Sequence, residues 1–161
     1  MNEFKYIINK ISNDMCFKAS NKDLIDIASK FFYFFYWFFD NLFILSKIKL
    51  IQNFDQSNLN KLAMLNWFLG NVTSILKMMM DLDELYKQKL YSDKSSKEAN
   101  LKLDKAIFNT YLNIIGKIGD CFPSSQGCNI PQRFIGRPWS ETTVGIGGLI
   151  SALVALKNTW K

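Results

Sequence analysis

The residues of this chain that could do chemistry are few, and the most unusual of them is Asp40. It is the single charged residue among the sixteen between Lys30 and Lys47, a stretch with seven phenylalanines. At 100° per residue, Asp40 shares a helix face with six other polar side chains: Lys22, Asp26, Ser29, Tyr33, Tyr36 and Lys47. Charged groups inside apolar helices tend to face water or other protein. This stripe therefore predicts either a helix contact fixed by Asp40 and Asn41 or the lining of a channel.

Catalysis and metal binding find little support. Histidine is absent, which removes histidine triads, imidazole acid/base chemistry and histidine metal sites. The three cysteines, Cys16, Cys121 and Cys128, form no CxxC pair, and their odd number argues against a disulfide framework. A bridge between Cys121 and Cys128 remains open. Without a nucleophile–base pair, metal cluster or carboxylate dyad, the sequence predicts no enzyme, no cofactor and no bound metal.

The basic charge does not indicate nucleic acid. The formal net charge is +6, but the eighteen lysines are scattered and only Arg133 and Arg137 could supply guanidinium forks. A lysine-bearing surface beside anionic lipid fits this pattern better.

The stripe needs a helix to carry it, and residues 22–50 are predicted to form one long aromatic helix. A central aspartate costs about 2.5 to 3.5 kcal/mol on the membrane-insertion scale, while Phe, Leu or Ile each returns about 0.3 to 0.6 kcal/mol. The seven phenylalanines with Leu42, Ile44 and Leu45 offset Asp40 only narrowly. The helix is thus either embedded in a bilayer or buried in a soluble bundle.

The remaining elements are also predicted to be helical. Residues 1–18 form an amphipathic helix with Phe4, Ile8, Ile11 and Met15 on one face, which lies either in a membrane interface or against a bundle. A cap at Ser20–Asn21 begins the aromatic helix. Apolar residues at steps of three and four predict helices at 61–90 and 101–118. The fold class is therefore all-α, a single membrane-associated bundle of four to five helices.

A long loop is expected at residues 119–140, because all three prolines, both arginines and several turn-forming residues lie there. Its apolar side chains would be unusual in a disordered linker. We therefore expect a partly ordered segment at a membrane surface, with Arg133, Arg137 and Trp139 at the depth of the headgroups.

The last element, residues 141–160, is predicted to be a transmembrane helix that packs on other helices. Fifteen uncharged residues separate Glu141 from Lys157, and Trp160 would mark the membrane interface. One face carries only small side chains, which allow helix backbones to approach closely: Gly145, Gly148, Ser151, Ala152 and Ala155. A soluble core helix is the alternative, while a phosphate-binding glycine loop lacks its Lys-Ser/Thr sequel.

Two blocks of sequence resemble the peroxisomal biogenesis factor 11 family. The first is Asp40-Asn41 with the apolar residues that follow, similar to the motif that ends the family's central aromatic helix. The second combines Gly119-Asp120-Cys121-Phe122-Pro123 with the glycine-rich stretch from Val144 to Ala152. Asp120 corresponds to the family's aspartate-bearing helix end. Only about twenty residues precede the aromatic helix, whereas family members usually carry a longer amphipathic region there.

The resemblance implies a protein of the peroxisomal membrane that promotes elongation, proliferation and division of peroxisomes. It implies amphipathic helix insertion, self-association into a homo-oligomer, and membrane lipid as a partner. Recruitment of a fission adaptor and a dynamin-like GTPase would follow. A metabolite channel and a soluble helical scaffold are the alternative functions.

Overall fold

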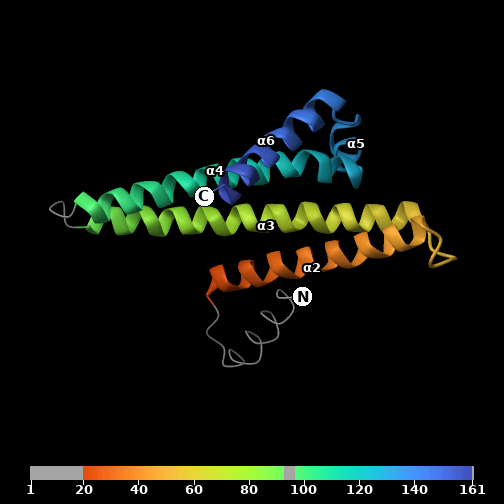
Figure 1. Cartoon of the computed structure of the whole chain (residues 1–161), viewed down its shortest axis with the longest axis horizontal. Helices are drawn as coiled ribbons and strands as arrows, with labels where there is room; N and C mark the ends of the chain where they lie inside the picture. The colour runs from red at the N-terminus through yellow and green to blue at the C-terminus, as the bar shows by residue number, and fades with distance from the viewer. Residues whose placement is uncertain (1–19, 93–96, 161) are drawn as a thin grey trace.

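The computed structural model describes residues 20–92 and 97–160, and within these ranges the chain forms five α-helices and no β-strand (Figure 1). The helices are α2 (Asn21–Lys47), α3 (Gln56–Tyr91), α4 (Lys97–Gly127), α5 (Ile130–Ile135) and α6 (Glu141–Thr159). The all-α prediction is confirmed. The amphipathic helix predicted at residues 1–18 lies outside the described residues.

Polar caps fix where the long helices begin. Ser20 accepts a hydrogen bond from the backbone N–H of Asp23, and the Asp23 carboxylate accepts one from the backbone N–H of Ser20, so α2 begins with a complete capping box. Asp55 caps α3 and Ser140 caps α6. In each case the side chain of the cap residue accepts at least one hydrogen bond from the backbone N–H groups of the first turn. The cap predicted at Ser20–Asn21 is therefore confirmed.

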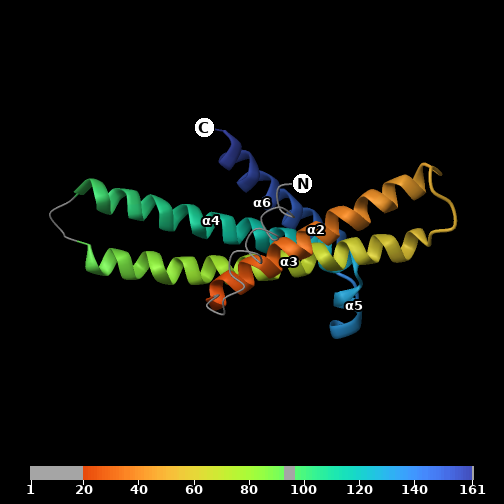
Figure 2. The same cartoon turned by 90° about the horizontal axis from the view of Figure 1, so that it is seen from below.

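The four long helices form an open array. Helix α3 packs on α2 on one side and on α4 on the other, while α4 also contacts α5 and α6. Figure 1 shows α2 and α6 on opposite flanks of the central pair of α3 and α4, and Figure 2 shows α2 crossing α3 at an angle. Among the described residues, α2 and α6 do not pack on each other.

The loop predicted at residues 119–140 is wrong in its first half. Helix α4 continues through Pro123 to Gly127, and α5 follows after a connection of two residues. Proline inside a helix lacks the N–H that would bond the carbonyl four residues earlier, here that of Gly119. The helix survives because packing against neighbouring helices compensates the weak helix propensity of proline and glycine.

The described core is unusual in being as polar as it is apolar. The buried hydrophobic side chains are Leu59, Ala63, Leu82 and Ile107, and the buried polar ones are Ser29, Ser46, Asn71, Ser124 and Ser125. Many large apolar side chains are exposed instead. Polar groups thus contribute to the helix contacts as much as apolar ones do, and many aromatic and aliphatic side chains point outward.

Within the described ranges, none of the helices combines the length and the apolar character that crossing a membrane requires. Residues 141–160 do form a helix, α6, and their predicted transmembrane character is not confirmed.

Candidate functional site

The polar stripe of α2 faces α3, and its first member is held by two carboxylates. Lys22 Nζ lies 2.6 Å from a carboxylate oxygen of Asp81 and 2.6 Å from one of Glu84. Its hydrogen bonds to Asp81 and then to Glu84 raise the pKa of Lys22. Burial acts to raise the pKa of Asp81, but Lys22 and Lys77 together hold it below its ordinary value. The start of α2 is therefore anchored to the second half of α3.

Hydroxyl and amide groups join the middle of the two helices. Ser29 Oγ lies 2.7 Å from Ser74 Oγ, and the Tyr33 hydroxyl donates a 2.7 Å hydrogen bond to Asn71 Oδ1. Gly70 lets the Tyr33 ring approach, since a Cβ at that position would lie 3.1 Å from the ring. Nδ2 of the fully buried Asn71 has no hydrogen-bond partner among the described residues, which costs about 1 to 3 kcal/mol.

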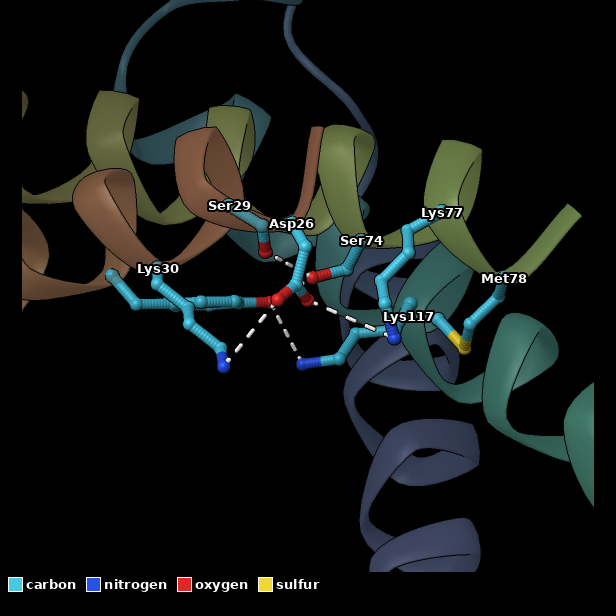
Figure 3. A pocket seen from close by; sticks show the side chains of 8 residues that line it. Asp26, Ser29, Lys30, Ser74, Lys77, Met78 and Lys117 are labelled. Carbon is cyan, nitrogen blue, oxygen red and sulfur yellow. Dashed lines mark hydrogen bonds and ion pairs between the residues drawn. The ribbon is translucent and has the colours of Figure 1, made fainter. Parts of the chain in front are cut away.

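Three lysines from three helices line one cavity beside this contact, and two of them pair with Asp26. Asp26 lies 3.4 Å from Lys30 Nζ and 3.7 Å from Lys77 Nζ. Lys117, from α4, donates a 2.8 Å hydrogen bond to the hydroxyl of Tyr33 and lies 4.8 Å from the centre of its ring. Figure 3 shows the three lysines pointing toward the same region, where they line a cavity of about 250 Å³.

The two aspartates of the family-like motifs act on one hydroxyl group. The Tyr36 ring stacks on Trp67, with ring centroids 5.6 Å apart. Burial raises the pKa of Tyr36 above its ordinary value, and the charges of Asp40 and Asp120 raise it further. The structure therefore brings Asp40, from α2, and Asp120, from α4, close enough to influence the same side chain, although they are far apart in the sequence.

Asn41 does not join this group. Its amide donates a hydrogen bond to the carbonyl of Trp37 in its own helix. Lys47, at the end of the stripe, lies 5.9 Å from the centre of the Phe43 ring, also in α2. Five of the seven stripe residues thus contact α3. None of these contacts involves Asp40 or Asn41, so a helix contact fixed by that pair stays a prediction, and so does the channel.

Helices α4 and α6 meet backbone to backbone at two glycines. A Cβ on Gly119 would lie 2.5 Å from the carbonyl oxygen of Gly147, and a Cβ on Gly147 would lie 2.8 Å from that of Gly119. Neither distance is tolerable for a side chain, so only glycine fits. Pro123 has no N–H, so the Gly119 carbonyl lacks the hydrogen bond that it would normally accept within α4. Gly147 approaches α4 at this same carbonyl.

The small-residue stripe predicted on α6 is not the face that packs on α4. Gly145 and Gly148 have open space where a Cβ would point. The contacts with α4 come instead from Gly147, Ser151 and Val154. Only Ser151 belongs to the predicted set, and Ala152 and Ala155 are exposed. Self-association through the stripe stays a prediction. Sequence reasoning missed Gly116, Gly119 and Gly147, whose common signal is glycine on two helices that must cross closely.

The residues predicted at a membrane interface have different surroundings. Trp139 is half-buried: its indole N–H donates to Ser125 Oγ at 3.1 Å, and its ring meets Phe122 edge to face. Trp160 is 79% exposed at the end of α6. Phe4, Ile8, Ile11 and Met15 lie outside the described residues.

The described cysteines are not bridged. Cys121 and Cys128 are free and partly buried. Burial, followed by the charge of Asp120, raises the pKa of the Cys121 thiol to about 11, so this side chain stays protonated at neutral pH. No group of acidic residues and cysteines within the described ranges could hold a metal ion.

Exposed apolar side chains cover the outer faces of the helices. On α2, Trp37 is 61% exposed and Phe38 is 48% exposed. On α6, Leu149 is 59% exposed and Leu153 is 56% exposed. Soluble monomers rarely expose so much apolar surface, and such surface usually marks a site of contact with protein or membrane.

Comparison with known proteins gives one family. The sequence profile described as peroxisomal biogenesis factor 11 matches residues 2–160. A curated relative from Dictyostelium discoideum, named peroxisomal membrane protein 11 homolog, is 26% identical over 148 residues, covering 79% of this chain. The match spans 58% of the length of that relative. No solved structure matches the chain.

Proposed function

The chain belongs to the peroxisomal biogenesis factor 11 family, and on that premise we propose that it elongates the peroxisomal membrane before division by inserting apolar helix faces into one leaflet. Membership places the chain in the peroxisomal membrane and in peroxisome biogenesis. Elongation, insertion and self-association are the parts that we propose.

The observation that carries this proposal is the reversed distribution of polar and apolar side chains. Between α2 and α3 the contacts include ion pairs and hydrogen bonds, such as Lys22 with Asp81 and Ser29 with Ser74, beside the stacked rings of Tyr36 and Trp67. Outside them lie aromatic and aliphatic residues with half or more of their surface exposed, including Trp37 and Leu149. Burying an exposed side chain of this size is worth about 1.5 to 3 kcal/mol. Several together favour transfer into the apolar part of a leaflet.

Insertion into one leaflet would change the shape of the membrane. Helices that lie at the boundary between headgroups and acyl chains enlarge the leaflet that they enter, and the opposite leaflet does not expand with it. A patch of such proteins would bend the bilayer into a tubule. We propose that Gly145, Gly148 and Ala152, which are open on α6, gather copies of the chain into such patches.

Elongated membrane would then be a substrate for division. We propose that an adaptor and a dynamin-like GTPase act on the tubule after the chain has formed it. No feature of the described helices identifies their binding site, so this step follows from family membership alone.

Liposomes test the shaping activity directly. The purified full chain is added to vesicles with the lipid composition of a peroxisomal membrane and examined by electron microscopy. We expect tubules with the wild-type chain and at least a fivefold loss of tubules with the Leu149→Ser/Leu153→Ser variant. The matched control is Leu90→Ser, because Leu90 is exposed near the end of α3, far along the chain from α6. Vesicles that keep their shape at high surface density of wild-type protein would refute the mechanism.

A further inference from the structure

The cavity between α2, α3 and α4 has the charge of an anion site (Figure 3). From the charges and their placement we propose that it binds a phosphate monoester group. The inference does not depend on membrane shaping, because it concerns the polar side chains at the junction of three helices and not the apolar outer faces.

The lining of the cavity carries more positive than negative charge. Eight residues line it, and the charged ones are three lysines and one aspartate: Asp26, Lys30, Lys77 and Lys117. Asp26 already lies within ion-pair distance of both Lys30 and Lys77. Asp81, 3.3 Å from Lys77, is shared with Lys22. Within the lining three ammonium groups face one carboxylate, so the charge of a phosphate monoester, about −1.5 to −2 at neutral pH, is opposite in sign to that of the lining.

The lysines converge because the helices pack, and not because they are neighbours in sequence. Lys30 comes from α2, Lys77 from α3 and Lys117 from α4. The side chains of Lys30 and Lys77 are 25% and 35% exposed, so both ammonium groups are partly withdrawn from water. Partly desolvated ammonium groups attract an anion more strongly than surface lysines do, because solvent screens them less.

Lys117 is the residue best placed to bind the ligand. Its ammonium group has three donors and uses one of them on the Tyr33 hydroxyl, at 2.8 Å. Among the described residues, Lys117 forms no ion pair with a carboxylate. Tyr33 also holds the lysine against its ring, at 4.8 Å from the ring centre, and so positions the remaining donors.

A second cavity indicates where the rest of the ligand would lie. It measures about 380 Å³ and shares Met78 and Lys117 with the first. It runs between α4 and α6, past the apolar Val154 and Ala155 and past polar groups that include the carboxylate of Asp120. A phosphate held at Lys117 therefore has a partly apolar space beside it. Both a phospholipid with a terminal phosphate and a small free phosphate ester present this chemistry.

Two probes distinguish these sources. The full chain is placed in nanodiscs of neutral lipid and titrated with glycerol 3-phosphate by calorimetry. In parallel, its affinity for vesicles is compared between phosphatidylcholine alone and phosphatidylcholine with phosphatidic acid. Saturable binding of glycerol 3-phosphate assigns the site to free esters. Saturable binding that needs phosphatidic acid assigns it to a lipid headgroup. Saturation in neither arm would overturn the proposal.

Matched lysine variants locate the binding. We expect Lys77→Met and Lys117→Met each to weaken the affinity at least tenfold, and Lys117→Arg to stay within threefold of wild type. Lys87→Met on α3 and Lys102→Met on α4 remove the same charge from exposed ion pairs on the same helices, and we expect changes below twofold. Equal weakening by all four methionine variants would overturn the proposal, because it would show attraction to net charge alone. Circular dichroism melts establish that each variant is folded, and the Lys117→Arg result remains decisive if Lys117→Met unfolds.

Discussion

At the scale of single residues, the ion pair of Asp81 with Lys22 makes stability depend on pH. The folded-state pKa of Asp81 lies below its ordinary value of 3.8, so the pair stabilises the fold above that pH and loses its effect as the pH falls through the folded-state pKa. We expect Asp81→Asn to lower the free energy of unfolding by about 1 kcal/mol at pH 7. The difference from wild type should shrink below about pH 4. Thermal melts in detergent at several pH values measure this.

The control for that prediction is Asp83→Asn. Asp83 and Lys87 form an ion pair whose side chains are 64% and 65% exposed, so screening by solvent leaves it little energy. We expect no resolvable change at any pH. A loss for Asp83→Asn as large as that for Asp81→Asn would contradict the role given to Lys22.

The same ion pair also limits stability at alkaline pH. Because the pKa of Lys22 is raised, its contribution to the free energy of unfolding should persist up to its ordinary pKa of 10.5 and fall at still higher pH.

Neighbouring glycines on α6 give a second residue-scale prediction. Gly147→Ala places a Cβ 2.8 Å from the Gly119 carbonyl oxygen, and backbone must move to relieve this. Gly148→Ala meets open space and replaces a poor helix former by the best one. We expect Gly147→Ala to destabilise by about 1 to 3 kcal/mol and Gly148→Ala to be neutral or to stabilise by up to about 1 kcal/mol. Chemical denaturation of the two variants in the same detergent compares them directly, and the reverse order would show that α6 packs through the other face.

At the scale of elements, α6 offers two faces with different tasks. One face, with Gly147 and Val154, packs on α4, and the other, with Gly145 and Gly148, is open. If the open face joins copies of the chain, Gly145→Leu/Gly148→Leu should abolish self-association and leave the melting temperature of the monomer within a few degrees. Energy transfer between labelled copies in proteoliposomes measures the association. Undiminished transfer would assign self-association to another surface.

The sequence predicted the helices well where local chemistry decides them. The predicted cap at Ser20–Asn21 marked the start of α2, and the 100° steps placed Lys22, Ser29 and Tyr33 on one face of α2. That face does contact α3, through Asp81, Ser74 and Asn71 respectively. Local rules were sufficient because a helix face is fixed once the helix exists.

The same rules failed where a tertiary contact decides. Pro123 and two glycines predicted that α4 would end near residue 119, yet the helix continues to Gly127. Gly116 and Gly119 are there because α6 approaches α4 too closely for larger side chains. Likewise, a helical wheel cannot tell whether Gly145 or Gly147 faces the neighbouring helix. The lysine site combines residues from three helices, and no spacing within one segment would have found Lys117 together with Lys30.

At the scale of the whole molecule, we expect the outward apolar surface to determine how the protein is held by a membrane. We expect the wild-type chain to remain with peroxisomal membranes after carbonate extraction. Trp37→Ser/Phe38→Ser and Leu149→Ser/Leu153→Ser should each shift part of the protein to the supernatant, because each removes about 3 to 6 kcal/mol of transfer free energy. Immunoblots of pellet and supernatant measure the shift. Complete retention of the combined fourfold variant would show that other parts of the chain hold it.

In the open array, α2 and α6 lie on opposite flanks and are only weakly coupled in energy. Helix α2 reaches the rest of the described fold mainly through α3, and α6 reaches it through α4, with Lys117 the residue of α4 that bonds directly to α2. Within the described part of the chain, Lys22 and Gly147 have no contact residue in common. The effects of substituting them on the free energy of unfolding should therefore add to within about 0.5 kcal/mol. A change at Lys117 should be non-additive with changes at Tyr33. One side chain would then carry the coupling between the aromatic and the glycine-rich ends of the protein.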